Sequence, residues 1–387
     1  MFYIQHGHGK AAKIASVSQA APVAGVILSP ANEDMRRLAD TADDCRARGL
    51  HVLLDPQSYI YSLSPLGIAR HHKSHGLEFL KLHWSQTADA VKKQVDAALL
   101  ANQNIGHLGP FIAPSPYQAN LTDYWMPTAL QYGRTSSAEW GADRTVATIA
   151  LDENVLRSWG GVQDWLDIIT TLDVSGFYLL VNRSRPVYPP TPWDPQVLAN
   201  LLRVIYTLTE LNGYELIWGY ADIDGLLGIA AGATAVASGW TYGLRAFSTA
   251  KWNETRTGGA PPVPRVYLPK LWAPLRSNEA EDLFGTAIGR AMFPSTLRSQ
   301  FDAHGFEPWG IADAQEQYLT YLARGVDALA RRGGVTDRVA TLVDRLQAAS
   351  GRFDEISTLG ITLDGRYSGR VRAYREALDL FRKSESL

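Results

Sequence analysis

The sequence contains a single cysteine, Cys45, among 387 residues. One thiol cannot form an intramolecular disulfide or supply a cysteine cluster to zinc, and it fits a reducing compartment. No apolar run reaches the roughly 18 residues that a membrane-spanning helix needs. The N-terminal segment does not have the pattern of a secretory signal, because Gln5, His6 and His8 interrupt the apolar stretch that such a signal needs. These absences predict a cytoplasmic protein that does not associate with membranes.

An excess of charge is also absent. Lys and Arg number 37 and Asp and Glu number 39, which gives a formal net charge of −2. This balance does not imply an extended phosphate-binding surface. The glycine-rich dinucleotide fingerprint, the phosphate-binding loop, the Gly-x-Ser-x-Gly elbow and the Cys-x-x-Cys pair are all missing. The sequence therefore supports none of the activities that depend on these motifs, and we expect no bound cofactor.

Eight short apolar runs are the main positive feature. Stretches with helical spacing separate most of them, and each run ends in a polar or Gly/Pro-rich turn. This repeated alternation is typical of a parallel sheet with helices outside it, and eight units predict an α/β fold that closes into a (β/α)8 barrel. The runs cover residues 2–6, 23–29, 51–55, 105–113, 145–152, 176–182, 214–220 and 234–238.

The pattern divides the chain into three parts. We assign residues 1–250 to the barrel and residues 251–275, which are rich in Gly, Pro and Thr and end in one more strand-like run, to a linker and extra strand. Residues 276–387 carry Leu/Val/Ala stripes with dense charged faces, which predict a C-terminal helical subdomain. That subdomain packs either on the barrel or on a protein partner.

Three carboxylates at strand ends are candidate catalytic groups, because the active site of a barrel enzyme lies where its strands end. They are Asp55, Asp152 and Asp222. Asp55 closes the third run and can equally cap the turn that follows it. Asp152 and Glu153 close the fifth run, and only one of two adjacent strand residues can face the barrel mouth. After the seventh run, Asp222 fits the mouth and Asp224 fits the N-cap of the next helix.

Other strand-end side chains are candidate substrate ligands. Trp240 can stack on a flat ring, and an Arg at the mouth offers a planar fork to phosphate or carboxylate. Two histidines at i and i+2 have metal-ligand spacing, but no second pair ends another strand, so we expect no metal. Each of these residues can instead serve packing alone. The set is His6, His8, Gln57, Asn182, Arg183, Tyr220, Trp240 and Arg245.

Several segments resemble the tRNA-guanine transglycosylase family of barrels. Asp55-Pro-Gln-Ser-Tyr59 followed by Tyr61-Ser-Leu63 is similar to that family's Asp-Ser-Gly-Gly-Phe/Tyr-Gln motif and its Phe-Ser-Leu stretch. Residues 76–83 and 218–222 resemble two later motifs. The family's cysteine-based zinc motif has no counterpart, and residues 237–239 stand where its nucleophilic Asp is expected. The resemblance implies a barrel that recognises a nucleobase through Asp55.

Three functions are compatible with these patterns. The first is an enzyme that transfers a glycosyl group or exchanges a base on a nucleobase, nucleoside or nucleic acid. The second is a barrel resembling glycoside hydrolases, with Asp152 or Glu153 paired with Asp222 and with Trp side chains as sugar platforms. The third is a non-catalytic barrel that binds a protein partner through its C-terminal helices.

Overall fold

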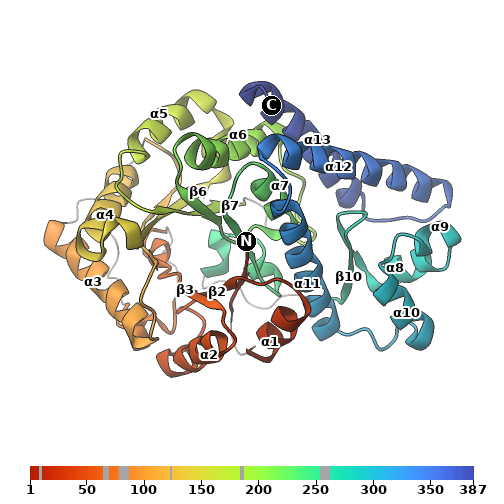
Figure 1. Cartoon of the computed structure of the whole chain (residues 1–387), viewed down its shortest axis with the longest axis horizontal. Helices are drawn as coiled ribbons and strands as arrows, with labels where there is room; N and C mark the ends of the chain where they lie inside the picture. Colours follow the sequence, from red (N-terminus) through yellow and green to blue (C-terminus); the bar gives the residue numbers. More distant parts are fainter. Residues whose placement is uncertain (8–10, 64–68, 78–86, 123, 184–186, 253–261) are drawn as a thin grey trace.

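The computed structural model describes residues 1–387 apart from 8–10, 64–68, 78–86, 123, 184–186 and 253–261. Its centre is a sheet of parallel strands that curls into a nearly closed barrel (Figure 1). The predicted (β/α)8 fold is confirmed, and each predicted run contains one barrel strand. These strands are β1 (Phe2–Gln5), β2 (Gly25–Leu28), β3 (His51–Leu54), β4 (Phe111–Ile112), β6 (Thr145–Asp152), β7 (Gly176–Asn182), β8 (Glu215–Trp218) and β9 (Ala235–Ser238).

Neighbouring strands follow the order β3-β2-β1-β9-β8-β7-β6-β4, and the short β5 (Tyr117–Gln118) also pairs with β6. β3 and β4 lie side by side at the two ends of this path. All seven residues of β7 are buried, as are the first seven of the eight residues of β6. Parallel strands that are covered on both faces need such continuous apolar runs, which is why the strands were recognisable in the sequence.

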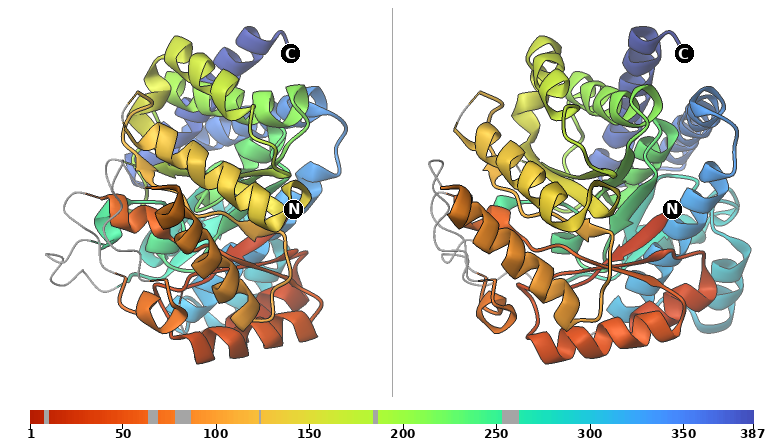
Figure 2. Two further views of the ribbon diagram at one scale, coloured as in Figure 1. Left: turned by 90° about the vertical axis from the view of Figure 1, so that its left-hand side faces the viewer. Right: turned by 60° about the vertical axis from the view of Figure 1, so that its left-hand side comes forward.

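Helices cover the outside of the barrel (Figures 1 and 2). Helix α6 illustrates how the sequence starts them, because Asp194 accepts hydrogen bonds from the amides of Gln196 and Val197, and Pro195 occupies the first helical position. The first seven helices are α1 (Ala11–Ala20), α2 (Met35–Ala47), α3 (Ala88–Asn104), α4 (Trp125–Trp140), α5 (Trp159–Ile169), α6 (Pro195–Tyr206) and α7 (Gly225–Ala230).

The place between α7 and α1 is filled by α11 (Ile311–Ala330), which comes from the C-terminal third of the chain. Its Leu319, Leu322 and Val326 belong to the same buried core as the barrel strands. The N-terminal part of α11 contacts α1 through a hydrogen bond that the Ser16 hydroxyl donates to the Glu316 carboxylate. The eighth helical position of the barrel is therefore supplied from beyond residues 251–275.

The remaining elements form a lobe beside the barrel (Figure 1). A second, smaller core of apolar side chains lies in this lobe, and stacked Phe301 and Phe306 belong to it. Helices α12 and α13 run back from the lobe onto α7 and α6. The elements are β10 (Arg265–Leu268), β11 (Ala273–Arg276), α8 (Ser277–Phe284), α9 (Ala287–Arg290), α10 (Ser295–His304), α12 (Val335–Thr358) and α13 (Gly365–Glu385).

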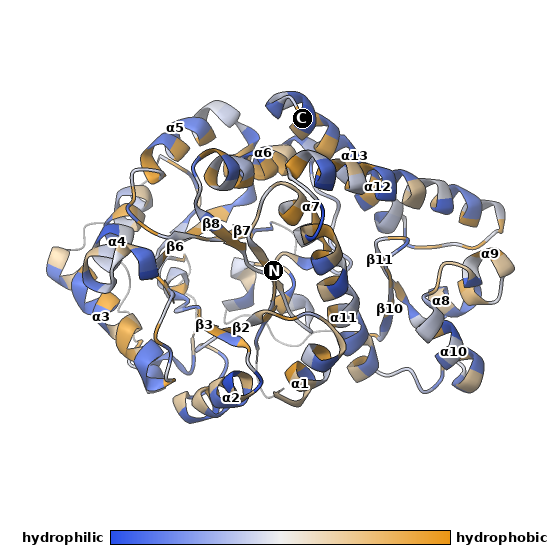
Figure 3. Cartoon of the chain, in the orientation of Figure 1, coloured by the Kyte–Doolittle hydropathy of each residue, from blue (hydrophilic) through white to orange (hydrophobic). Residues whose placement is uncertain are grey.

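Hydropathy follows this arrangement, with hydrophobic strands β7 and β8 inside helices that alternate between hydrophobic and hydrophilic faces (Figure 3). None of the helices in the described part of the chain is both long enough and apolar enough to span a lipid bilayer.

Candidate active site

Asp55, directly after β3, is the most completely enclosed carboxylate among the predicted candidates. Its side chain is 1 % exposed. One oxygen accepts a hydrogen bond from the amide of Gln57 at 2.9 Å, and the other accepts from the hydroxyls of Tyr59 at 2.9 Å and Tyr178 at 3.3 Å. The carboxylate therefore lies inside the barrel mouth and is held by groups from both β7 and the loop after β3.

Burial raises the pKa of Asp55 to about 6, because removing the carboxylate from water penalises its charged form. The hydrogen bonds from Gln57, Tyr59 and Tyr178 and the charge of Lys251 oppose this rise. The balance leaves a group that can hold or release a proton close to neutral pH. This is the property that a general acid or base needs.

Three non-glycine residues near the barrel mouth have left-handed backbone conformations. They are Gln57 after β3, with φ 54°, and Tyr220 and Asp222 after β8, with φ 54° and 48°. Such conformations cost free energy and gather at functional sites, where surrounding contacts hold them. Here they bring the Gln57 amide to 3.5 Å from the Tyr220 hydroxyl.

Four buried aromatic rings pack against one another beside Asp55, to which one of them donates a hydrogen bond, and we call them the aromatic cluster. They are Tyr59, Tyr220, Phe247 and Trp252. Ring centroids are separated by 5.1 Å between Tyr59 and Phe247, by 5.5 Å between Tyr59 and Trp252, and by 5.7 Å between Tyr220 and Phe247. Edge-to-face and tilted packing of this kind holds the four rings in a rigid group.

Lys251 reaches into this cluster from the segment after β9. Its Nζ lies 5.1 Å from the ring centroid of Trp252 and 5.4 Å from that of Tyr220. The Nζ atom is shielded from solvent and makes no hydrogen bond to the described residues. Burial lowers the pKa of Lys251 to about 8, although the charge of Asp55 acts in the opposite direction. Asp55 and Lys251 thus form a pair whose pKa values converge toward neutrality.

The stem of Lys251 also lines a cavity of about 530 Å³ between the barrel mouth, β10 and α11. A cavity of this volume is large enough for a small-molecule ligand. Among the described lining residues, Arg245 and Arg265 are cationic and the aromatic side chains are Tyr188, Trp240, Tyr242, Tyr267 and Tyr318.

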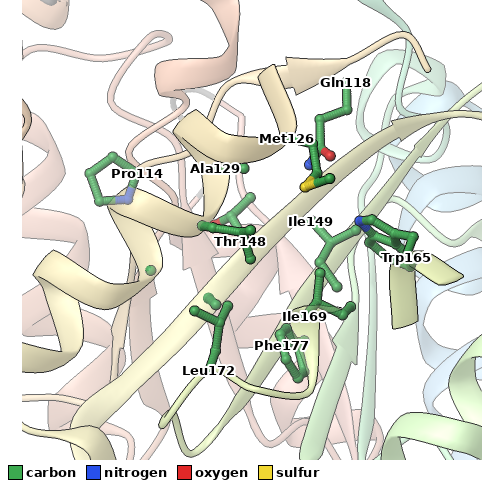
Figure 4. Close-up of a pocket in the computed structure, with 13 residues that line it drawn as sticks. Pro114, Gln118, Met126, Ala129, Thr148, Ile149, Trp165, Ile169, Leu172 and Phe177 are labelled. Atoms are coloured by element: carbon green, nitrogen blue, oxygen red, sulfur yellow. The ribbon is translucent and has the colours of Figure 1, made fainter. Parts of the chain in front are cut away.

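A second space lies outside the sheet, between α4, α5 and strand β6 (Figure 4). Its walls include Met126, Thr148, Ile149 and Trp165, and its volume is about 20 Å³. A space of this size holds roughly one water molecule. It is a packing defect in the outer layer and not a ligand site.

The structure places Asp222 and Asp224 in a buried ionic network. Arg370 from α13 lies 3.2 Å from Asp222 and 2.9 Å from Asp224, and Tyr318 donates to Asp222 at 2.6 Å. Asp224 precedes α7, but its side chain makes no capping hydrogen bond. The expected capping role of Asp224 is therefore wrong, because its carboxylate is used by Arg370 and by Trp193, which donates at 2.7 Å.

Asp152, Asn182, Glu153 and Arg183 are brought together at the ends of β6 and β7. Asp152 accepts from the Asn182 amide at 2.8 Å and from the backbone amide of Asn154 at 3.0 Å, so it caps the turn after β6. Glu153 pairs with Arg183 at 2.9 Å. The guanidinium of Arg183 lies over the ring of Trp193, 3.6 Å from its centroid.

Residues near the ends of β1 and β9 form a third group. His6 is buried and meets Trp240 edge to face, with ring centroids 5.5 Å apart. Arg245 lies over the ring of Tyr318 at 3.5 Å and donates to the carbonyl oxygens of Gly239 and Trp240. His8 lies outside the described residues, as do positions 78–83 of the resemblance.

Asp55, Gln57 and Tyr220 are thus the predicted residues that the structure brings into one buried, hydrogen-bonded group. Sequence reasoning missed Lys251, Phe247 and Trp252, which it placed in or beside a linker. The spacing of Phe247, Lys251 and Trp252 at i, i+4 and i+5 was an available signal. It also missed Tyr59 and Tyr178 as hydrogen-bond donors to Asp55.

Within the described ranges, no three or more His, Cys, Asp or Glu side chains are grouped so that they could hold a metal ion. The barrel mouth therefore offers carboxylic acid, amine, amide and phenol groups for its chemistry.

No family model matches this chain, and no curated protein matches it. Among solved structures, a similar chain is that of a probable tagatose 6-phosphate kinase from Sinorhizobium meliloti 1021. The two chains share 13 % sequence identity over 99 % of each, with a TM-score of 0.28. A likeness this weak carries no argument about fold or function.

Proposed function

We propose that this protein is a barrel enzyme that acts on the glycosidic bond of a nucleobase-containing substrate, by base exchange or glycosyl transfer. The observation that carries the proposal is the enclosed Asp55 carboxyl beside the aromatic cluster. The resemblance of residues 55–63 to the tRNA-guanine transglycosylases supports it, because Asp55 is the position that the resemblance assigns to base recognition.

The chemistry of the pocket suits a flat heterocycle. A nucleobase presents hydrogen-bond donors and acceptors along one edge and two apolar faces. The Asp55 carboxyl and the Gln57 amide offer an acceptor and a donor to such an edge. The rings of Tyr59, Tyr220, Phe247 and Trp252 offer faces for stacking, which is worth about 1–3 kcal/mol per base.

Asp55 also suits the proton transfer that this reaction requires. A base leaves a sugar more readily when one of its nitrogens is protonated as the bond breaks. A carboxyl with a pKa of about 6 is populated in both its acid and its ionised form near neutral pH. Asp55 can therefore protonate the leaving base and afterwards accept a proton from the incoming one.

The alternative resembling glycoside hydrolases needs two carboxylates that are available to a sugar. Asp222 is engaged by Arg370 and Tyr318, and Asp152 is engaged by Asn182, Tyr117 and the turn that it caps. The scaffold alternative needs unpartnered C-terminal helices, whereas apolar residues of α11, α12 and α13 share the core of the barrel. Asp55 is hydrogen-bonded as well, but it is the carboxylate that the resemblance assigns to base recognition and whose pKa lies near neutrality, and we therefore favour base chemistry at Asp55.

The test is incorporation of a radiolabelled free base into bulk tRNA or single-stranded DNA by the full chain. Asp55→Asn keeps the shape of the side chain but removes its acidity, and we expect it to lower the rate by about 10²–10⁴-fold. Asp40→Asn on the exposed face of α2 is the matched control and should leave the rate unchanged. Full activity in Asp55→Asn, or no incorporation of any base, would contradict the proposal.

A further inference from the structure

The Lys251 amine is a buried ionisable group beside the aromatic cluster that base recognition does not use. Its Nζ is enclosed by the rings of Tyr220 and Trp252 and has no hydrogen-bond acceptor among the described residues. Structural lysines normally place their charge in water or against a carboxylate. An amine held inside the barrel mouth, with Nζ shielded from water and not hydrogen-bonded to any described carboxylate, calls for a chemical explanation.

The surroundings of Lys251 favour an uncharged amine, which is the nucleophilic form. The aromatic walls withhold the water that stabilises an ammonium ion, and the pKa of the amine falls to about 8. At pH 7 the neutral fraction of such an amine exceeds that of an exposed lysine, with its pKa near 10.4, by about 10²-fold. The charge of Asp55 reaches Lys251, so the acid and the amine serve the same space.

We propose that Lys251 is the nucleophile of this site and forms a covalent bond to the anomeric carbon, C1′, of the sugar that carries the base. This inference rests on the proposed function, since it names the group that takes the place of the leaving base. The other mouth carboxylates are engaged elsewhere, Asp222 by Arg370 and Asp152 by Asn182.

The step begins with a neutral Lys251 amine and a protonated Asp55. The Nζ lone pair forms a bond to C1′ while the bond from C1′ to the base nitrogen breaks. That bond's electron pair leaves with the base, which takes the proton of Asp55. The new ammonium at Nζ then returns one proton to the Asp55 carboxylate. The products are the free base, a sugar bound to Lys251 as a glycosylamine (an N,O-acetal), and a protonated Asp55.

The sugar ring of this glycosylamine can open without any change in composition. The Nζ lone pair forms a double bond to C1′, the bond from C1′ to the ring oxygen breaks, and that oxygen gains a proton as the nitrogen loses one. The result is an imine between Lys251 and the open sugar. From the closed glycosylamine, Asp55 first protonates Nζ. A nitrogen of a second base then forms a bond to C1′ while the bond from C1′ to Nζ breaks, and the N–H proton of that base passes to the Asp55 carboxylate. This step releases the neutral amine, restores protonated Asp55 and completes base exchange.

The imine can be tested with a sugar aldehyde as the probe. The full chain is incubated at pH 7 with ribose 5-phosphate and cyanoborohydride, which reduces an imine to a stable secondary amine. Peptide mass spectrometry then locates the modified lysines. We expect Lys251 to be modified at least tenfold faster than the exposed Lys93 and Lys383. Modification of Lys251 no faster than those controls would overturn the proposal.

A matched pair of variants separates this inference from the proposed function. Lys251→Met keeps a long apolar stem without the amine and should abolish base incorporation, whereas Lys93→Met should not. Base incorporation that persists in Lys251→Met would overturn the nucleophile and leave the proposed function intact. Fast trapping at Lys251 in a protein that exchanges no base would support the nucleophile and overturn the proposed function. If Lys251→Met does not fold, the comparison of lysines within the unmodified protein decides.

Discussion

At the scale of single residues, the fold uses burial to move two pKa values toward each other. The pKa of Asp55 is raised to about 6 and the pKa of Lys251 is lowered to about 8. The main cause in both cases is burial, which removes the water that stabilises the charged form. Isolated in water these groups would ionise far apart, near 3.9 and 10.4. Enclosure beside the aromatic cluster brings both into the range where proton transfer at neutral pH is efficient.

This convergence predicts a bell-shaped dependence of kcat/KM on pH, with apparent pKa values of about 6 and 8 that belong to the pair. The step needs a protonated Asp55 and a neutral Lys251, so the fall in rate at high pH comes from loss of the Asp55 proton. In Asp55→Asn the residual activity should therefore lose the basic limb and keep the rise that follows deprotonation of Lys251. Rates of base incorporation between pH 5 and 9 measure both curves. A basic limb that survives in Asp55→Asn would assign it to another group.

The stability of the protein should also report the burial of Asp55. Because its pKa is raised on folding, the folded state retains a proton between about pH 4 and 6 that the unfolded state has lost, so stability falls as pH rises through this window. Relative to Asp55→Asn, the wild type should lose about 2 kcal/mol between pH 4 and 7. Urea unfolding at the two pH values measures this difference.

Other buried groups do not disturb that comparison. His72, whose pKa burial lowers to about 3, titrates in both proteins and cancels. If the difference in free energy of unfolding between wild type and Asp55→Asn does not change with pH, the pKa of Asp55 is not raised by folding.

At the scale of elements, one buried side chain of α13 makes an ionic contact with the barrel in addition to the apolar packing of this helix. Arg370 is 1 % exposed and contacts both Asp222 and Asp224, which follow β8. Two buried carboxylates in this position would be costly without a cation. The network therefore explains why both aspartates are found at the barrel mouth without being available to a substrate.

Removal of the cation should expose that cost. Arg370→Met leaves two carboxylates buried without their partner, and we expect the free energy of unfolding to fall by about 3–5 kcal/mol. Arg372→Met, which changes an exposed residue of the same helix, should alter it by less than about 0.5 kcal/mol. Equal changes in the free energy of unfolding for the two substitutions, measured by urea unfolding, would show that the network does not stabilise the fold.

The elements also show how far the sequence alone could go. The barrel strands were recognisable because strands covered on both faces are continuously apolar, and their ends locate Asp55 and Gln57 within a few residues. Phe247 and Trp252 were not recognisable as site residues, because they meet Tyr59 across nearly 200 positions of the chain. Lys251 was not recognisable either, because its place beside Tyr220 and Trp252 depends on the same packing. Tyr178 was hidden inside a strand whose apolar character drew attention to its packing alone.

At the scale of the whole molecule, the C-terminal third completes the barrel. α11 occupies the position between α7 and α1, and a hydrogen bond between Ser238 of β9 and Tyr318 of α11 links the last strand to this helix. The aromatic face of Tyr318 also supports Arg245 at the edge of the large cavity. The wall of this cavity is therefore shared between the segments that follow β7 and β9 and the C-terminal third of the chain.

A shortened chain should not retain a packed barrel. Residues 1–276 lack α11, α12 and α13, so the inner faces of α1 and α7 would lie open to water. We expect this fragment to lose its near-ultraviolet circular dichroism and its cooperative thermal transition. A fragment that unfolds in a single sharp transition would show that the barrel is independent of the C-terminal helices.

The most direct measurement of the central claim is a crystal structure of the full chain soaked in turn with each free nucleobase. The account predicts a planar ring against the aromatic cluster, with one edge within hydrogen-bond distance of the Asp55 carboxyl and the Gln57 amide. A base bound at another place, or a pocket that admits no base while the crystals remain intact, would contradict it.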